Sequence, residues 1–131
     1  MARVIAVALA LVCSAGPARA SAVFGCQAAD QNVVGLELEG GTPRDGDTLI
    51  SLEGAIEIVP GQRIEFGKAE VVKFVWKKTP QLDIRKRLAG FSFVEIRIRT
   101  RVGDDETSFP GTYAVRTETL SRAGRLNCSG G

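Results

Sequence analysis

The chain contains no histidine, and this absence excludes several kinds of active site. Histidine is the usual general base near neutral pH and the commonest metal ligand in proteins. Without it, neither a Ser-His nor a Cys-His nucleophile pair can form. A glycine-rich phosphate-binding motif is also missing from the sequence. The composition therefore favours a protein that is not an enzyme and that needs no metal or other cofactor.

Cysteine is scarce, with only Cys13, Cys26 and Cys128 in 131 residues. Cys13 lies in an N-terminal apolar segment that we expect to be removed, so two cysteines would remain, and an even number in an exported protein predicts a disulfide. A Cys26–Cys128 bridge would close a loop of about a hundred residues and contribute roughly 4.7 kcal/mol in the chain-entropy model. It would also exclude a thiolate nucleophile and a soft-metal site. Two unpaired thiols are the alternative.

Long apolar runs are absent except near the start of the sequence. Residues 1–20 combine a basic start at Arg3, an apolar run over 4–12 and a small-residue exit at 18–20, which is the order of a secretory signal peptide. The run is too short to span a bilayer. We therefore predict cleavage after Ala20, a single exported domain over residues 21–131 without a transmembrane segment, and a periplasmic or secreted location.

Two alternatives concern the same leader. An uncleaved N-terminal anchor is disfavoured by the helix-breaking pair Gly16-Pro17 and by Arg19. Lipid attachment is disfavoured at Cys13 by the bulky Val12 before it, and at Cys26 by its position beyond the apolar run.

Net charge indicates no attraction to nucleic acid. Two of the 17 basic residues, Arg3 and Arg19, lie in the leader, so basic and acidic residues are equal in number after cleavage. Their distribution is uneven, because residues 21–66 hold eight acids and two bases whereas residues 67–131 hold seven acids and thirteen bases. If strands of the two halves pair, these charges can neutralise each other within the molecule.

A period of two dominates the sequence after the leader, and it is clearest over 94–102, where apolar and charged residues alternate. This is typical of a strand with one buried face. Further strands are expected at 33–39, 49–53, 55–59, 63–66, 69–77 and 113–120, with turns at Gly40-Gly41, Asp45-Gly46, Pro60-Gly61, 103–105 and Pro110-Gly111. Such short connections favour antiparallel neighbours.

One segment departs from this pattern. Thr79 is suited to cap a helix, Pro80 to begin it, the basic run 85–87 to lie at its C-terminal end, and Gly90 to close it in a left-handed conformation. The sequence thus predicts an all-β fold, an antiparallel β-sandwich or small β-barrel of about seven strands, with one short helix near 80–89. An irregular loop is the alternative to the helix, and residues 129–131 are expected to fray.

Arg97, Arg99 and Arg101 alternate along one predicted strand, so they share a face and form a row of guanidinium groups. Such a row suits phosphate or carboxylate groups of an anionic envelope polysaccharide or lipid. The more ordinary interpretation is cross-strand pairing with glutamates, for which the candidates are Glu37, Glu57, Glu65 and Glu118.

Other candidate residues favour structural roles. Carboxylates at 45–47 and 104–106 match no complete calcium-loop spacing, so exposed turns are the better interpretation. Trp76 and Tyr113, each the only residue of its kind, are expected in the core, Trp76 on the face of Val72 and Phe74 and Tyr113 on the face of Val115. Partner binding is the alternative for both.

By elimination, these features favour a non-catalytic interaction protein of the bacterial envelope that binds, caps or inhibits another envelope or secreted protein. The first alternative is a binding module for an anionic polysaccharide or lipid, with Arg97, Arg99 and Arg101 as the contacts. A weaker alternative is a glycan-cleaving enzyme that uses carboxylates alone, which would need two carboxyl groups about 5 to 9.5 Å apart in a cleft.

Overall fold

The computed structural model describes residues 22–43, 48–90 and 92–130. The predicted leader, the Asp45-Gly46 turn and the carboxylates at 45–47 lie outside the described residues. Within those ranges, no helix has the length and apolar character needed to cross a membrane.

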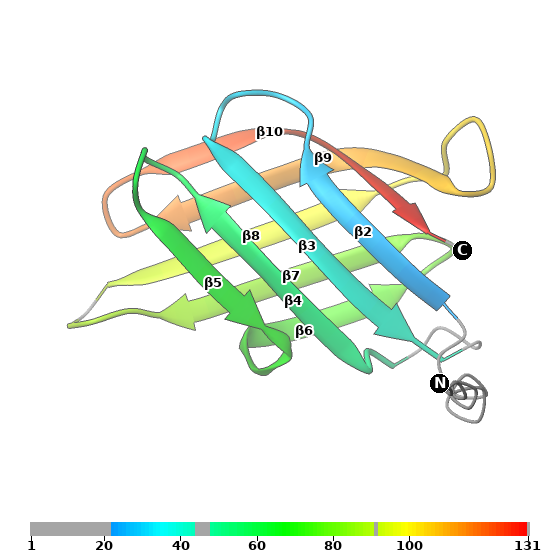
Figure 1. Ribbon diagram of the computed structural model, residues 1–131, viewed down its shortest axis with the longest axis horizontal. Helices are drawn as coiled ribbons and strands as arrows, with labels where there is room; N and C mark the ends of the chain where they lie inside the picture. Colours follow the sequence, from blue (N-terminus) through cyan, green and yellow to red (C-terminus); the bar gives the residue numbers. More distant parts are fainter. Residues whose placement is uncertain (1–21, 44–47, 91, 131) are drawn as a thin grey trace, which may run out of the picture.

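Nine antiparallel strands form one sheet that curls into a nearly closed barrel (Figure 1). The strands are β2 (Ala22–Ala28), β3 (Gly35–Thr42), β4 (Ser51–Glu57), β5 (Arg63–Gly67), β6 (Val71–Trp76), β7 (Pro80–Arg87), β8 (Phe93–Thr100), β9 (Ser108–Thr117) and β10 (Ser121–Gly130). Their order in the sheet is β5-β4-β3-β2-β10-β9-β8-β7-β6, so β5 and β6 are its two edges. The predicted all-β antiparallel fold is confirmed, with nine strands rather than about seven.

Figure 1 shows the four strands β2–β5 crossing in front of the five strands β6–β10. Each group is a meander in which neighbours along the chain pair with each other. The two meanders are joined in the sheet by the pairing of β2 with β10. The acidic and basic halves of the sequence therefore form different sides of the barrel, and most of their strands do not pair across halves.

The helix predicted near 80–89 is wrong, and so is the loop alternative, because this segment is strand β7. Leu82 and Ile84 point into the core with relative exposures of 0% and 1%, and Asp83 and Arg85, which alternate with them, point outward. The alternation of apolar and charged residues is thus a better guide to this segment than its helix-capping residues are. Gly90 has the expected positive φ of 71°, but it lies in the β7–β8 turn.

Several turn predictions are also wrong. Gly40-Gly41 lies inside β3 and Pro110-Gly111 lies inside β9. The fraying predicted for 129–131 is wrong for residues 129 and 130, which belong to β10 and pair with β2, and residue 131 lies outside the described residues. At Gly40, an added Cβ would overlap the ring of Phe24, so this glycine makes room for an aromatic side chain. By contrast, the Pro60-Gly61 turn, with φ of 85° at Gly61, and the loop that includes residues 103–105 connect strands as predicted.

The strand predictions differ from the structure in three further places. Segments 49–53 and 55–59 contribute to a single strand, β4, and strands β2 and β10 were not expected. A register shift between Val71 and Lys73 in β6 turns Val72 outward, where it is 66% exposed. Val72 therefore does not share the buried face of Phe74 that the simple alternation predicted.

Aromatic side chains fill the interior of the barrel. Phe24 lies 6.1 Å from Phe74 and 5.9 Å from Trp76 between ring centroids, and Trp76 meets Phe109 edge-on at 6.0 Å. Tyr113 is 1% exposed. The core role predicted for Tyr113 is confirmed, whereas Trp76 is partly buried and packs against the core.

The disulfide between Cys26 and Cys128 is also confirmed. The two residues are directly opposite in the β2–β10 ladder, with Cα atoms 4.0 Å apart, and both side chains are buried. The covalent link therefore lies at the pairing that joins the two meanders.

Candidate functional site

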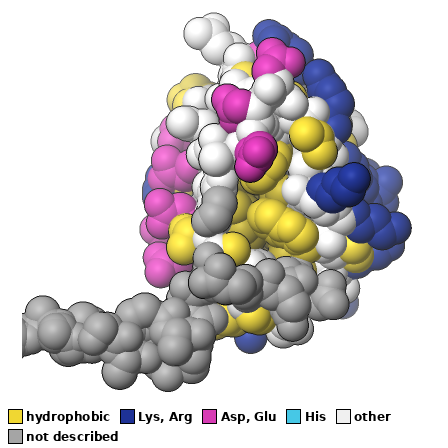
Figure 2. Space-filling model, turned by 90° about the vertical axis from the view of Figure 1, so that its right-hand side faces the viewer, with side chains coloured by type: hydrophobic (Ala, Val, Ile, Leu, Met, Phe, Trp, Pro, Cys, Tyr) yellow, Lys and Arg dark blue, Asp and Glu magenta, His cyan; other side chains and the backbone are white. Residues whose placement is uncertain are grey.

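Charge is divided between two sides of the barrel. Figure 2, which views the molecule from the right-hand side of Figure 1, shows acidic side chains mainly towards one side and lysine and arginine along the opposite side. The outward positions of β3–β5 are rich in glutamate, whereas those of β6–β10 are rich in arginine. Each side offers a candidate binding surface.

We call the outward side of β6–β10 the basic face. Its members share one side of the sheet because cross-strand partners in the ladder point the same way. They are Lys73, Arg85, Arg87, Arg97, Arg99, Arg116 and Arg125, with the acids Asp83 and Glu95. Six arginines and one lysine thus face two carboxylates, so the face has a strong positive excess.

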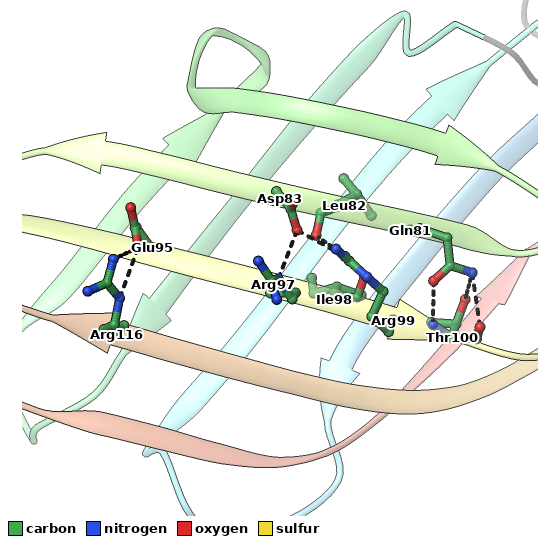
Figure 3. Close-up of polar contacts among 9 residues, drawn as sticks. All are labelled: Gln81, Leu82, Asp83, Glu95, Arg97, Ile98, Arg99, Thr100 and Arg116. Atoms are coloured by element: carbon green, nitrogen blue, oxygen red, sulfur yellow. Dashed lines mark hydrogen bonds and ion pairs between the residues drawn. The ribbon is translucent and has the colours of Figure 1, made fainter.

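Glu95 holds two of these arginines in place, and Figure 3 shows its contact with one of them, Arg116. It lies on the central strand β8, with Arg85 opposite on β7 and Arg116 opposite on β9, and it forms ion pairs with both. Arg116 Nε also donates to Glu95 Oε1 at 3.1 Å. Both guanidinium groups lie over the ring of Phe93, at 4.8 and 5.4 Å from its centroid. The cluster therefore presents two fixed arginines around an aromatic ring.

Asp83 contacts a second pair of arginines, Arg97 and Arg99 (Figure 3). Its Oδ1 lies 3.5 Å from Arg97 Nε and 2.9 Å from Arg99 Nη1. Neither contact is aligned as a hydrogen bond, and Arg99 Nη1 donates instead to the carbonyl oxygens of Leu82 at 3.1 Å and Ile98 at 2.9 Å. Arg99 is thus anchored, whereas the side chain of Arg97 is 66% exposed.

The predicted row of three arginines is only partly together in the structure. Arg97 and Arg99 meet around Asp83, but Arg101 follows the end of β8 and lines the groove described below. Arg97 and Arg99 pair with Asp83 of their own meander, and not with the glutamates proposed from the sequence.

Those glutamates have other contacts. Glu37 and Glu65 each lie 3.5 Å from Arg63, and Glu57 accepts a hydrogen bond from the amide of Gly61. Glu118 accepts a hydrogen bond from Ser92 Oγ at 2.7 Å, and this contact is the main cause that lowers the pKa of Glu118.

A hollow of about 370 Å³ lies within the basic face. Small side chains, Ala114 and Ser121, contribute to its lining, and Arg85, Arg97 and Arg116 are part of the same lining. A carboxylate or phosphate placed there would meet guanidinium groups from three adjacent strands, together with the carboxylates of Asp83 and Glu95, which also line the hollow and already contact these arginines.

The other surface is an open groove of about 1300 Å³, which we call the acidic groove. Its charged lining consists of the acids Glu37, Glu39, Glu53, Glu65, Glu70, Asp104 and Asp105 and the bases Arg63, Lys86 and Arg101. Arg63 is engaged by two of the glutamates, and Lys86 Nζ donates to the carbonyl oxygen of Glu65. The groove therefore has a clear negative excess.

Glu39 and Glu53 lie directly opposite each other in the β3–β4 ladder. Both side chains are exposed. They therefore form an exposed carboxylate pair in an open groove, whereas the proton donor of a glycan-cleaving enzyme normally lies in an apolar pocket.

A polar cluster links the loop after β2 to strands β9 and β10. Asp30, which follows β2, accepts hydrogen bonds from the Tyr113 hydroxyl at 2.7 Å and from the Arg125 amide at 2.7 Å. These two bonds, in that order, lower the pKa of Asp30. Burial, followed by the bond to Asp30, raises the pKa of Tyr113 to about 12. Because this hydroxyl is buried and donates its hydrogen bond to Asp30, the cluster anchors the loop after β2 to β9 and β10.

The described residues contain no group of three or more Cys, Asp or Glu side chains arranged to hold a metal ion. In the 101–107 loop, Asp105 Oδ1 accepts hydrogen bonds from the amide and hydroxyl of Thr107 at 2.9 and 3.0 Å. This carboxylate therefore stabilises a turn.

Sequence reasoning missed Asp83, Glu95 and Arg116 as members of the basic face. Asp83 was assigned to a helix, and the strand register that sets Glu95 against Arg85 and Arg116 is not encoded in local periodicity. Comparison of the chain with protein-family models, with curated proteins and with solved structures finds no match.

Proposed function

We propose that this chain is a non-catalytic interaction protein of the bacterial envelope, periplasmic or secreted, that binds an acidic surface of another envelope or secreted protein. The contact surface is the basic face. The observation that carries the proposal is the pair of clusters in which Asp83 and Glu95 each contact two arginines.

Two physical features support a protein partner. Arginine and aromatic residues are enriched at protein interfaces, whereas lysine is depleted, and the basic face combines six arginines with Phe93. Four of its six arginines, Arg85, Arg97, Arg99 and Arg116, already contact carboxylates before any partner arrives, so binding loses less side-chain entropy than with free arginines. Arg97 and Arg116 keep more than half of their side-chain surface exposed and remain available for contact.

The test uses a double variant, Arg97→Gln with Arg116→Gln. The protein is exported by a bacterial host and purified with its disulfide oxidised. Binding of envelope proteins to the immobilised chain should weaken about tenfold, which corresponds to roughly 1.4 kcal/mol. Arg63→Gln is the matched control, because it removes an exposed arginine from the acidic groove instead. Equal binding by the double variant and the control would contradict the proposal.

An anionic envelope polysaccharide or lipid is the second candidate ligand, and the hollow flanked by Arg85, Arg97 and Arg116 is the feature that favours it. It predicts retention on vesicles of anionic phospholipid, or on an anionic polysaccharide, that is lost in the same double variant. Unchanged retention would exclude this ligand class for the basic face.

A further inference from the structure

The acidic groove contains an arrangement that costs the isolated molecule stability. Four residues form one cross-strand row through the groove, in the order Gly67, Glu53, Glu39 and Gly25. The two glutamates are therefore direct neighbours of like charge, which is destabilising in a sheet. Among the described residues, neither has an ion-pair partner within 4.0 Å.

The glycines at both ends of this row leave the two carboxylates uncovered. A Cβ at Gly25 would approach no atom closer than 3.6 Å, and one at Gly67 no atom closer than 3.4 Å. Packing within the molecule therefore does not require glycine at either position. Their effect is to open the floor of the groove around two carboxylates that no cation in the described part of the chain approaches within 4.0 Å, an environment that a cationic side chain from outside would fit.

The same chain carries the complementary surface. The basic face has seven cations against two acids, and it lies on β6–β10, whereas Glu39 and Glu53 of the groove lie on β3 and β4. Figure 2 shows the separation of the two charge types across the molecule. Because the two surfaces belong to different sides, one molecule cannot bring its own face into its own groove.

We propose that the acidic groove binds the basic face of a second copy of this chain. Two exposed arginines of the face, Arg97 and Arg116, enter the groove and pair with Glu39 and Glu53. Such a contact joins two different surfaces, so it is heterologous and produces head-to-tail chains unless a ring closes. The contact also covers the basic face, so self-association competes with the binding of the partner protein. For this role of the basic face, the inference rests on the proposed function.

Sedimentation velocity of the exported, oxidised protein provides the test. At low salt the weight-average sedimentation coefficient should rise with protein concentration, and in about 1 M salt, where the Debye length is about 3 Å, it should return to the monomer value. A monomer at every concentration in low salt would overturn the proposal.

Charge reversal makes the test specific. A groove variant (Glu39→Lys with Glu53→Lys) and a face variant (Arg97→Glu with Arg116→Glu) should each lose the concentration-dependent shift. An equimolar mixture of the two should regain it, since each reversed surface then meets a complementary one. Glu106→Lys with Glu118→Lys, which changes net charge equally outside the groove lining, should keep the shift.

Two further results would overturn the proposal: association that survives in the groove variant, or a mixture that stays monomeric although both variants melt cooperatively. Should a reversal variant fail to fold, Glu39→Gln with Glu53→Gln replaces it and should also lose the shift. The groove variant must still bind envelope proteins in the pull-down. If the unaltered protein binds envelope proteins but does not self-associate, this inference is refuted and the proposed function is not. If the face variant loses partner binding and the groove variant keeps it, the proposed function is supported independently of self-association.

Discussion

At the scale of single residues, Tyr113 offers the most direct measurement, because it is the only tyrosine in the chain. Its ultraviolet absorbance should titrate near pH 12 in the folded protein, against about 10 in the unfolded chain. Since the folded state holds the proton more tightly, this residue should stabilise the fold fully below pH 10 and lose that contribution as the pH rises towards 12.

Asp30→Asn is the companion variant. It removes the negative charge that the Tyr113 hydroxyl faces, so the tyrosine pKa should move down towards 10. The variant should also lose the acid sensitivity that Asp30 contributes, because a carboxylate with a lowered pKa stabilises the fold above its unfolded value and loses that effect as the pH falls. An unchanged tyrosine titration in Asp30→Asn would show that the hydrogen bond is not formed in solution.

Gly124 is required by the same cluster for steric reasons. A Cβ at this position would overlap the carboxylate of Asp30 and the hydroxyl of Tyr113. Gly124→Ala should therefore destabilise the fold by about 1–3 kcal/mol in urea denaturation. Gly35→Ala is the control, because no atom lies within 4 Å of its added Cβ. Similar midpoints for both variants would contradict the described packing.

At the scale of elements, the β3–β5 ladders allow a matched pair of charge changes. Glu53→Lys would place a lysine opposite Glu39 and should raise stability by up to about 1 kcal/mol, most clearly at low salt. Glu57→Lys would instead place a lysine opposite Arg63 and should lower the stability of the fold. Thermal denaturation at low and high salt measures both, and shifts of equal sign would mean that the register is different.

The elements also show how far the sequence predicts the fold. Strand β8 was clear because charged and apolar residues alternate there without interruption. Strand β7 was missed because Thr79, Pro80 and Gly90 resemble helix signals, although Leu82 and Ile84 already alternate with charged residues. Strands β2 and β10 are rich in glycine and small residues, so they lack a strong periodic signal and depend on pairing with each other.

The candidate site was predictable only in part, for a similar reason. Alternation alone places Arg97 and Arg99 on one face. The acids that these arginines contact depend on the partner strand and its register. Asp83 can be identified as such an acid only if β7 is known to be a strand. The acidic groove was not foreseen at all, since it combines positions from both meanders and a connecting loop.

At the scale of the whole molecule, the disulfide is expected to be the largest single contribution to stability. Replacing both Cys26 and Cys128 with alanine should cost about 4 kcal/mol, because a crosslink over 102 residues restricts the unfolded chain strongly. Denaturation midpoints with and without reductant should differ for the natural chain and coincide for the variant. A reductant effect that persists in the variant would point to another cause.

The order of strands in the sheet has a consequence for folding. Every pairing except β2 with β10 joins neighbours along the chain, and Gly130 lies opposite Phe24 near the start of β2. A circular permutant that links residue 130 to residue 22 and opens between β5 and β6 would convert the barrel into one uninterrupted series of hairpins. Its contact order would fall, so it should fold faster than the natural connectivity without any change in the contacts of the native state.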